Sequence, residues 1–202
     1  MLIAVRHGIT SFNDNGGKGG GAEKFRGWLP VPLTLEGMKQ AEETADDLAD
    51  LEDVRVLYCS DVVRTVQSAT EIGERLLLEI EPVMELRDWN LGVYVGKPVQ
   101  DVLKEVLAHI DTPDKVVKEG ESYSTFLKRA VPFLSQLVES DDVCIAVTHA
   151  RVLGLLKALS LNQGKYPDLK TLKSKAPIGP AGIMILSSDW KILYMTKKEE
   201  GA

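Results

Sequence analysis

Short apolar runs alternate with segments of helical periodicity along most of this chain. Four runs have the length of buried strands, and they cover residues 2–6, 54–59, 79–83 and 143–148. In five other segments apolar residues recur every three or four positions, which predicts helices at 35–50, 61–77, 98–110, 122–139 and 150–161. Strands that alternate with helices in this way favour an α/β domain with a parallel sheet.

The end of the chain has a different pattern. Apolar runs at 181–187 and 190–196 are separated by a short polar turn, which predicts a hairpin that closes the sheet. We therefore predict a three-layer αβα sandwich with a mostly parallel central sheet and a C-terminal hairpin. Because 202 residues with 44% apolar content suit one substantial core, a single domain over residues 1–202 is expected.

Composition and charge exclude several classes of function. The chain has 24 Lys and Arg against 30 Asp and Glu, a formal charge of -6, so a basic nucleic-acid-binding surface is not expected. No apolar stretch reaches membrane-spanning length, and the first residues lead straight into a strand, which predicts neither a signal peptide nor a membrane anchor. Cys59 and Cys144 fall in predicted buried strands and indicate reduced thiols, as in a cytoplasmic enzyme. The oligomeric state stays open.

The first strand ends in a cluster of groups that can bind an anion. Arg6, His7 and Gly8 directly follow the apolar run, at the carboxyl end where α/β proteins keep their chemistry. Thr10 and Asn13 add a hydroxyl and an amide shortly after them. Such donors suit the oxygens of a phosphate, and the imidazole is a nucleophile, so this segment predicts phosphoryl transfer to His7.

Two later strands end in residues of the same kind. Ser60 and Asp61 follow the second strand as candidate N-caps, and Arg64 lies in the first turn of the next helix, where the helix dipole disfavours a cation unless an anion is near. His149 follows the strand at 143–148 and meets His7 if the two strands are parallel neighbours. The two histidines lack the i, i+4 spacing and a third partner expected of metal ligands, so a phosphate site without metal or cofactor is favoured.

Five motifs in register resemble the histidine phosphatase superfamily, the phosphoglycerate-mutase-like proteins. They span residue 3 to about residue 186 and are Arg6-His7-Gly8-x-Thr10-x-x-Asn13, the helix start Leu33–Ala41, Ser60-x-x-x-Arg64, Gly120-Glu121-Ser122 and Val147-Thr148-His149. The resemblance implies the predicted fold and a phosphohistidine at His7. It further implies that Arg6, Arg64 and His149 hold the transferred group, while Thr10 and Asn13 orient it.

The resemblance also implies a general acid in the loop after the third strand. The family places a carboxylic acid four residues before a Gly, and here that position is Asp88, before Gly92. Most of the family has Glu there, and Asp is one methylene shorter and slightly more acidic. Glu85 is therefore the reserve candidate for protonating the leaving oxygen.

A glycine-rich segment over residues 14–27 departs from the family pattern. Five glycines lie within residues 16–21, but Lys18 is followed by Gly19 and no helical pattern begins there, so the segment is not a Walker motif. We predict a mobile loop that overhangs the site as a lid, with Lys18 or Arg26 touching substrate.

Three hypotheses about function follow. The first is a metal-independent phosphatase that hydrolyses small phosphomonoesters, with water taking the phosphoryl group from His7. The second is a phosphoglycerate-type mutase, for which the segment from Gly92 to Ile110 is compact and offers only Lys97 and Lys104 as cations. The third is a catalytically inactive phosphate-binding module, suggested only by Asp88 in place of Glu. In each case the expected partner is a small phosphorylated molecule, with no nucleic acid or membrane.

Overall fold

The computed structural model describes residues 1–13, 22–167, 172–173 and 177–196. Within them one sheet is formed by β1 (Leu2–Arg6), β2 (Val54–Ser60), β3 (Ile80–Val83), β4 (Val143–Thr148), β5 (Ile183–Leu186) and β6 (Ile192–Met195). The strand order is β3-β2-β4-β1-β5-β6. β3, β2, β4 and β1 run parallel to one another, β5 runs antiparallel to β1, and β6 runs antiparallel to β5. The predicted sheet and its C-terminal hairpin are confirmed.

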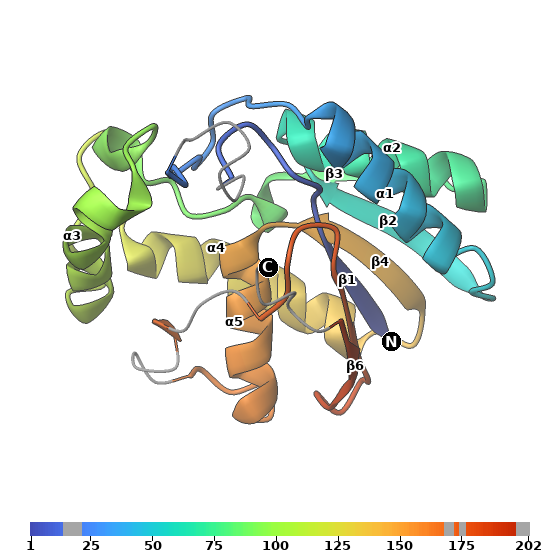
Figure 1. Ribbon diagram of the computed structural model, residues 1–202. Coiled ribbons are helices and arrows are strands. Elements are labelled where there is room, and N and C mark those ends of the chain that lie inside the picture. The colour runs from blue at the N-terminus through green and yellow to red at the C-terminus, as the bar shows by residue number, and fades with distance from the viewer. Residues whose placement is uncertain (14–21, 168–171, 174–176, 197–202) are drawn as a thin grey trace.

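Helices cover both faces of the sheet, as Figure 1 shows. On one face lie α1 (Leu35–Asp47) and α2 (Val63–Leu76), and on the other lie α4 (Tyr123–Glu139) and α5 (Ala150–Leu161). α3 (Val99–Asp111) lies at one end of the molecule, away from the sheet. The three-layer prediction is thus confirmed. None of the described helices combines the length and the apolar character needed to cross a bilayer.

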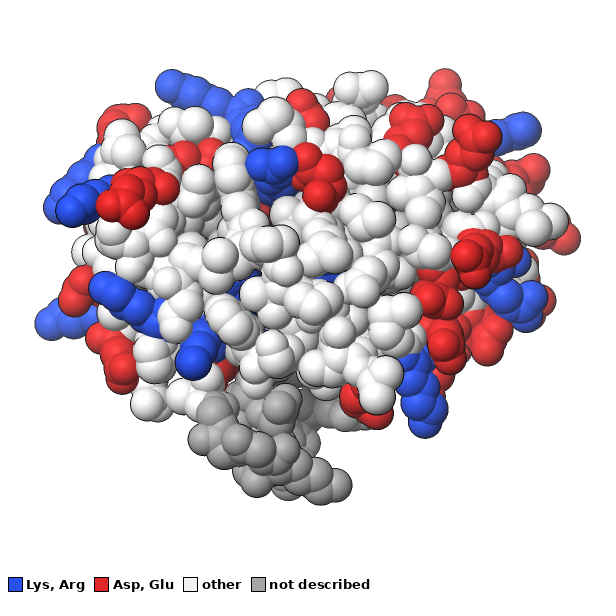
Figure 2. Space-filling view, turned by 90° about the horizontal axis from the view of Figure 1, so that it is seen from above, with Lys and Arg blue, Asp and Glu red and all other residues white. Residues whose placement is uncertain are grey.

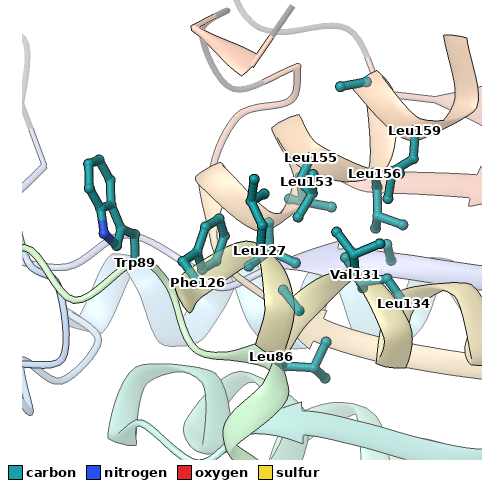
Figure 3. Packing of buried hydrophobic residues seen from close by; sticks show 14 of the residues in the cluster. Leu86, Trp89, Phe126, Leu127, Val131, Leu134, Leu153, Leu155, Leu156 and Leu159 are labelled. Atoms are coloured by element: carbon teal, nitrogen blue, oxygen red, sulfur yellow. The ribbon is translucent and has the colours of Figure 1, made fainter. Parts of the chain in front are cut away.

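Side chains of the central strands alternate between two cores. In β1, Leu2 and Ala4 pack in the larger cluster with α4 and α5, whereas Ile3 and Val5 pack in the smaller cluster with α1 and α2. Figure 3 shows the larger cluster as a row of side chains from α4 and α5 that ends at Trp89, beside Phe126. Because both faces of the central strands are covered, their runs are continuously apolar, and only their ends reach polar surroundings.

Some element ends differ from the predictions. The hairpin strands are shorter than expected because Ala181 and Trp190 have φ angles of +57° and +66°, and a left-handed residue interrupts an extended strand. The prediction that Ser60 or Asp61 caps α2 was wrong: the N-cap is Val62, with no side-chain hydrogen bond. Asp61 instead accepts two hydrogen bonds from Arg87, at 2.5 and 2.6 Å.

Between β3 and α3 the chain forms two short 3₁₀ helices, η1 (Met84–Leu86) and η2 (Gly92–Tyr94), which the sequence pattern did not predict. Cys59 and Cys144 are buried and free, and burial raises the pKa of the Cys59 thiol to about 12. Most of the predicted glycine-rich lid, including Lys18, lies outside the described residues.

Two glycines let α1 approach the turn that follows His7. A Cβ on Gly8 would lie 2.3 Å from the Gly37 carbonyl oxygen, and one on Gly37 would lie 2.1 Å from the Ile9 carbonyl oxygen. Both distances are far shorter than van der Waals contact with rigid backbone. The start of α1, capped by the Thr34 hydroxyl on the Gly37 N–H at 3.0 Å, therefore fixes the backbone beside His7.

We predict that Gly37→Ala destabilises the protein by about 1–3 kcal/mol, the usual cost of forcing extra atoms into a packed site. The measurement is the free energy of unfolding in urea. Gly154→Ala is the matched control, because nothing lies within 4 Å of its added methyl group. Alanine in that helix interior should stabilise by roughly 0.5–1 kcal/mol. Equal stability of the Gly37→Ala and wild-type proteins would contradict the steric interpretation.

Candidate active site

The ends of three parallel strands bring His7, Ser60 and His149 to one edge of the sheet. Arg6 pairs with Thr148 across β1 and β4, so the histidines that follow them leave the sheet side by side. Their ring centroids are 5.3 Å apart with an interplanar angle of 64°. The meeting of the two histidines that the sequence predicted is therefore present in the structure.

Arg64 lies between the two rings. It is in the first turn of α2 and only 1% exposed. Its Nε donates to His7 Nε2 at 3.3 Å, and one terminal nitrogen lies 3.1 Å from His149 Nδ1. The guanidinium also donates to the carbonyls of Leu29 at 3.0 Å and Gly27 at 2.8 Å. A cation that the helix dipole disfavours is thus held by four acceptors from three parts of the chain.

These contacts define which ring nitrogens carry protons. A guanidinium only donates, so His7 Nε2 and His149 Nδ1 must accept from Arg64. The other nitrogen of each ring then carries the proton. His7 Nδ1 donates to the Gly8 carbonyl at 2.7 Å, and His149 Nε2 donates to the Ser60 hydroxyl at 2.9 Å. Both imidazoles are neutral, and the lone pair of His7 is on Nε2.

The surroundings keep both imidazoles neutral. Burial lowers the pKa of His7 and of His149 well below 6.5, and the charge of Arg64 lowers both pKa values further. Arg26 and Arg6 act in the same direction. Burial also lowers the pKa values of Arg6 and Arg64 to about 10, so both stay charged at neutral pH. The site therefore combines neutral nucleophilic nitrogen with fixed positive charge.

The remaining predicted phosphate-binding residues are Thr10 and Asn13, on the turn after β1, and Arg26, at the end of the glycine-rich segment. Asn13 Oδ1 accepts from the Thr10 N–H at 2.9 Å and its hydroxyl at 3.1 Å, and Arg26 Nε donates to the same hydroxyl at 3.2 Å. Arg6 donates to the Ile178 carbonyl at 2.9 Å, while its buried Nε has no hydrogen-bond partner among the described residues. The unused donor leaves Arg6 able to bind an anion.

The two candidate acids occupy different positions. The charge of Asp88 raises the pKa values of Arg6, Arg26 and Arg64, so its carboxylate lies near enough to interact with the cationic cluster. Its Oδ1 accepts from the Trp89 N–H at 2.8 Å. Glu85 lies in η1, and among the described charges it is not one that shifts these pKa values. Of the two candidates, Asp88 is therefore the one whose charge acts on the cationic cluster.

Sequence reasoning missed two serines of the site. Ser60, interpreted as a helix cap, instead orients His149. Ser68 accepts from the Gly8 N–H at 3.2 Å and donates to the Arg64 carbonyl at 3.1 Å. Ser68 follows Arg64 by one helical turn, and this i, i+4 spacing on the face of α2 toward the sheet was a usable signal.

The cationic cluster is not displayed on the surface. In Figure 2 acidic side chains gather on the side of α1 and α2, and uncharged surface covers much of the centre. Arg6 and Arg64 are at most 7% exposed. The attraction for an anion is thus confined to the interior of the site. No group of three or more potential metal ligands occurs among the described His, Cys, Asp and Glu residues.

Comparison with known proteins agrees with this arrangement. The family model of the histidine phosphatase superfamily, branch 1, matches residues 2–178. The chain belongs to this superfamily. Phosphoserine phosphatase 1 of Hydrogenobacter thermophilus is 29% identical over 155 residues, which are 73% of this chain and 70% of that protein. Phosphoglycerate mutase-like protein 4 of Arabidopsis thaliana is 26% identical over 161 residues, 75% of this chain and 67% of that protein.

A solved structure shows the same superfamily fold. The mycobacterial glucosyl-3-phosphoglycerate phosphatase in complex with VO3 superposes with a TM-score of 0.74 at 23% identity, covering 98% of this chain and 97% of that one. The relatives of this chain thus include proteins named as phosphatases and proteins named as mutase-like. These matches establish the superfamily and the fold.

We predict that two of the three histidines stay neutral down to pH values well below 6.5. His7 and His149 are buried beside Arg64, so protonating either ring would place a second positive charge next to the first. The measurement is a pH titration of the histidine ring resonances by NMR, with His109→Gln to identify the third signal.

The same shift has a consequence for stability. The unfolded chain binds protons at these histidines near pH 6.5, and the folded chain does so only at lower pH. The free energy of unfolding should therefore fall as the pH drops below 6.5, by up to about 1.4 kcal/mol per pH unit for each histidine. Ordinary titration of His7 and His149 near pH 6.5 would contradict the interpretation.

Proposed function

We propose that this member of the histidine phosphatase superfamily hydrolyses small phosphomonoesters through a phosphohistidine intermediate on His7, without a metal ion. The observation that carries the proposal is the neutral His7 ring, whose Nε2 lone pair faces a buried arginine. A nucleophile needs a free lone pair, and a phosphate dianion needs positive charge at the same point. Both needs are met within one hydrogen-bonded cluster.

In the first step the phosphate enters the cluster and takes the place of His7 Nε2 as acceptor for Arg64. His7 Nε2 then attacks phosphorus, the bond to the ester oxygen breaks, and its electron pair leaves with that oxygen. Asp88, as a carboxylic acid, gives the leaving oxygen a proton. Nδ1 keeps its proton and its hydrogen bond to Gly8, which holds the ring in place during transfer.

In the second step water attacks the phosphorus of the phosphohistidine. The bond between phosphorus and Nε2 breaks, the electron pair returns to the ring, and the Asp88 carboxylate accepts the proton from the water. Arg6 and Arg64 neutralise the oxygens that become more negative during both transfers, which is the task of Mg²⁺ in many other phosphoryl-transfer sites. Thr10, Asn13 and Arg26 orient the group through the network described above.

Hydrolysis is favoured over mutase chemistry by the segment between Asp88 and α4. A mutase must hold a second substrate hydroxyl and its charged group long enough to return the phosphoryl group. From Gly92 to Ile110 this segment offers Lys97 and Lys104 as its only basic side chains besides His109, and Lys97 lies over the Tyr94 ring at 5.6 Å. Intact Arg6, His7, Arg64 and His149 support an active enzyme over an inactive binding module.

His7→Ala should abolish phosphate release while the protein stays folded, because the substitution removes the nucleophile from the end of a strand and leaves the strand intact. Brief incubation of wild type with ³²P-labelled substrate and an alkaline quench should leave acid-labile label on the protein, and none on His7→Ala. His109→Gln is the control and should label like wild type. Appreciable turnover by folded His7→Ala would overturn the proposal.

Asp88→Asn should slow an alkyl phosphomonoester about 10²- to 10⁴-fold, the usual worth of general acid catalysis, and an activated aryl ester far less. The reason is that an aryl oxide leaves without a proton. The measurement compares kcat/KM on β-glycerol phosphate and on p-nitrophenyl phosphate, because kcat/KM reports the steps up to departure of the leaving oxygen and excludes the water attack that both esters share. Glu85→Gln is the matched control and should be nearly silent on both. Equal losses on both esters after Asp88→Asn would mean that Asp88 is not the acid.

A further inference from the structure

The loop that carries Asp88 lacks a regular hydrogen-bond ladder of its own. It runs from η1 to η2, and its backbone carbonyls need partners from elsewhere in the protein. One side chain of α4 supplies most of them. One terminal nitrogen of Arg129 donates to the carbonyls of Met84 at 2.8 Å, Glu85 at 3.1 Å and Arg87 at 3.1 Å, and the other donates to the Asp88 carbonyl at 3.2 Å.

Glu121 holds the same loop from the other side. Its Oε1 accepts from Arg129 at 2.8 Å and from the Asn90 N–H at 3.0 Å. Its backbone carbonyl accepts from the Trp89 indole N–H at 3.0 Å, and its backbone N–H donates to the Asn90 carbonyl at 3.1 Å. Glu121 and Arg129 together therefore bond to every residue from 87 to 90.

The pair also restrains the Asp88 side chain through its neighbours. Trp89 is fully buried, and its backbone N–H donates to Asp88 Oδ1 at 2.8 Å. The Trp28 indole donates to the Asp88 carbonyl at 2.7 Å, next to the Arg129 bond, and the Arg129 guanidinium lies 5.7 Å from the Trp28 ring. The backbone and the carboxylate of Asp88 are thus both restrained by groups that contact Arg129 or Glu121.

We propose that the Arg129–Glu121 ion pair is the positioning device for the general acid: it sets where the Asp88 carboxyl group meets the leaving oxygen. This inference rests on the proposed function, in which Asp88 is that acid. The side chains of Arg129 and Glu121 are 10% and 11% exposed, so the ion pair is shielded from solvent. A planar guanidinium serves several carbonyls and a carboxylate at once, which the ammonium of lysine cannot do in one plane.

A short acid makes this positioning important. Asp88 reaches one methylene less far than Glu, so its backbone must be brought to the correct distance from the substrate. A displacement of about 1 Å in a reacting group can cost roughly 10²-fold in rate. The bonds to Arg129 end on the backbone of Asp88 itself, which is where such a displacement would arise.

The test compares kcat/KM on β-glycerol phosphate and on p-nitrophenyl phosphate for Arg129→Gln, because kcat/KM excludes the water attack that both esters share. We expect a loss of about tenfold to 10²-fold in kcat/KM on the alkyl ester and little change on the aryl ester. The ratio of the two rates does not depend on the fraction of folded enzyme, so partial instability of the variant does not disturb the readout. Arg129→Lys should restore only part of the ratio.

Two further variants complete the experiment. Glu121→Gln keeps the shape of the side chain and removes its charge, so it should shift the ratio in the same direction, and it carries the test if Arg129→Gln does not fold. Arg75→Gln breaks an exposed ion pair with Asp46 on the far side of the sheet and should leave the ratio at its wild-type value. In an Asp88→Asn background, Arg129→Gln should cause no further selective loss.

The outcomes separate this inference from the proposed function. If Asp88→Asn slows only the alkyl ester, but Arg129→Gln and Glu121→Gln slow both esters equally or neither, the positioning role is overturned and the acid assignment stands. A selective loss that adds fully to that of Asp88→Asn also overturns it, because Arg129 would then act independently of Asp88. If Asp88→Asn shows no selective loss, the acid assignment itself fails, and the inference fails with it.

Discussion

The structure of the site depends on one buried positive charge. Arg64 is almost completely removed from water, at the start of a helix whose dipole disfavours it. Burying an unpaired charge is costly, so the surrounding groups must compensate for the lost hydration. Two carbonyls and two imidazole nitrogens accept its hydrogen bonds, and the Asp88 carboxylate stabilises its charge from a distance. Burial and this same charge together keep both histidines neutral.

Much of this could be predicted from the sequence, because the decisive residues lie next to strong local signals. His7 and His149 each follow a continuous apolar run, and the carboxyl ends of parallel strands share one edge of a sheet. Arg64 follows the second such run by a few residues. The alternation of runs and helical segments was sufficient for the fold, since packing on both faces of a parallel sheet requires that pattern.

The rest depends on contacts between distant segments that no local pattern encodes. Ser60 has the residue type of a helix cap, but the chain turns into α2 two residues later, and its hydroxyl bonds instead to His149, which is 89 positions away. The choice between Glu85 and Asp88 depended on the path of an irregular loop. That path is fixed by Glu121, which comes from the segment after α3, and by Arg129, which comes from α4. Neither residue carries a spacing signal that points to the loop.

The tryptophans give the loop a natural spectroscopic label. The protein has three of them, and two bond directly to Asp88: Trp28 through its indole N–H and Trp89 through its backbone. The third, Trp190, lies at the turn of the C-terminal hairpin and bonds to Glu139. Intrinsic fluorescence is therefore weighted toward the surroundings of the acid loop. Movement of this loop when a ligand arrives can be followed by stopped-flow emission in the unmodified protein, with no introduced dye.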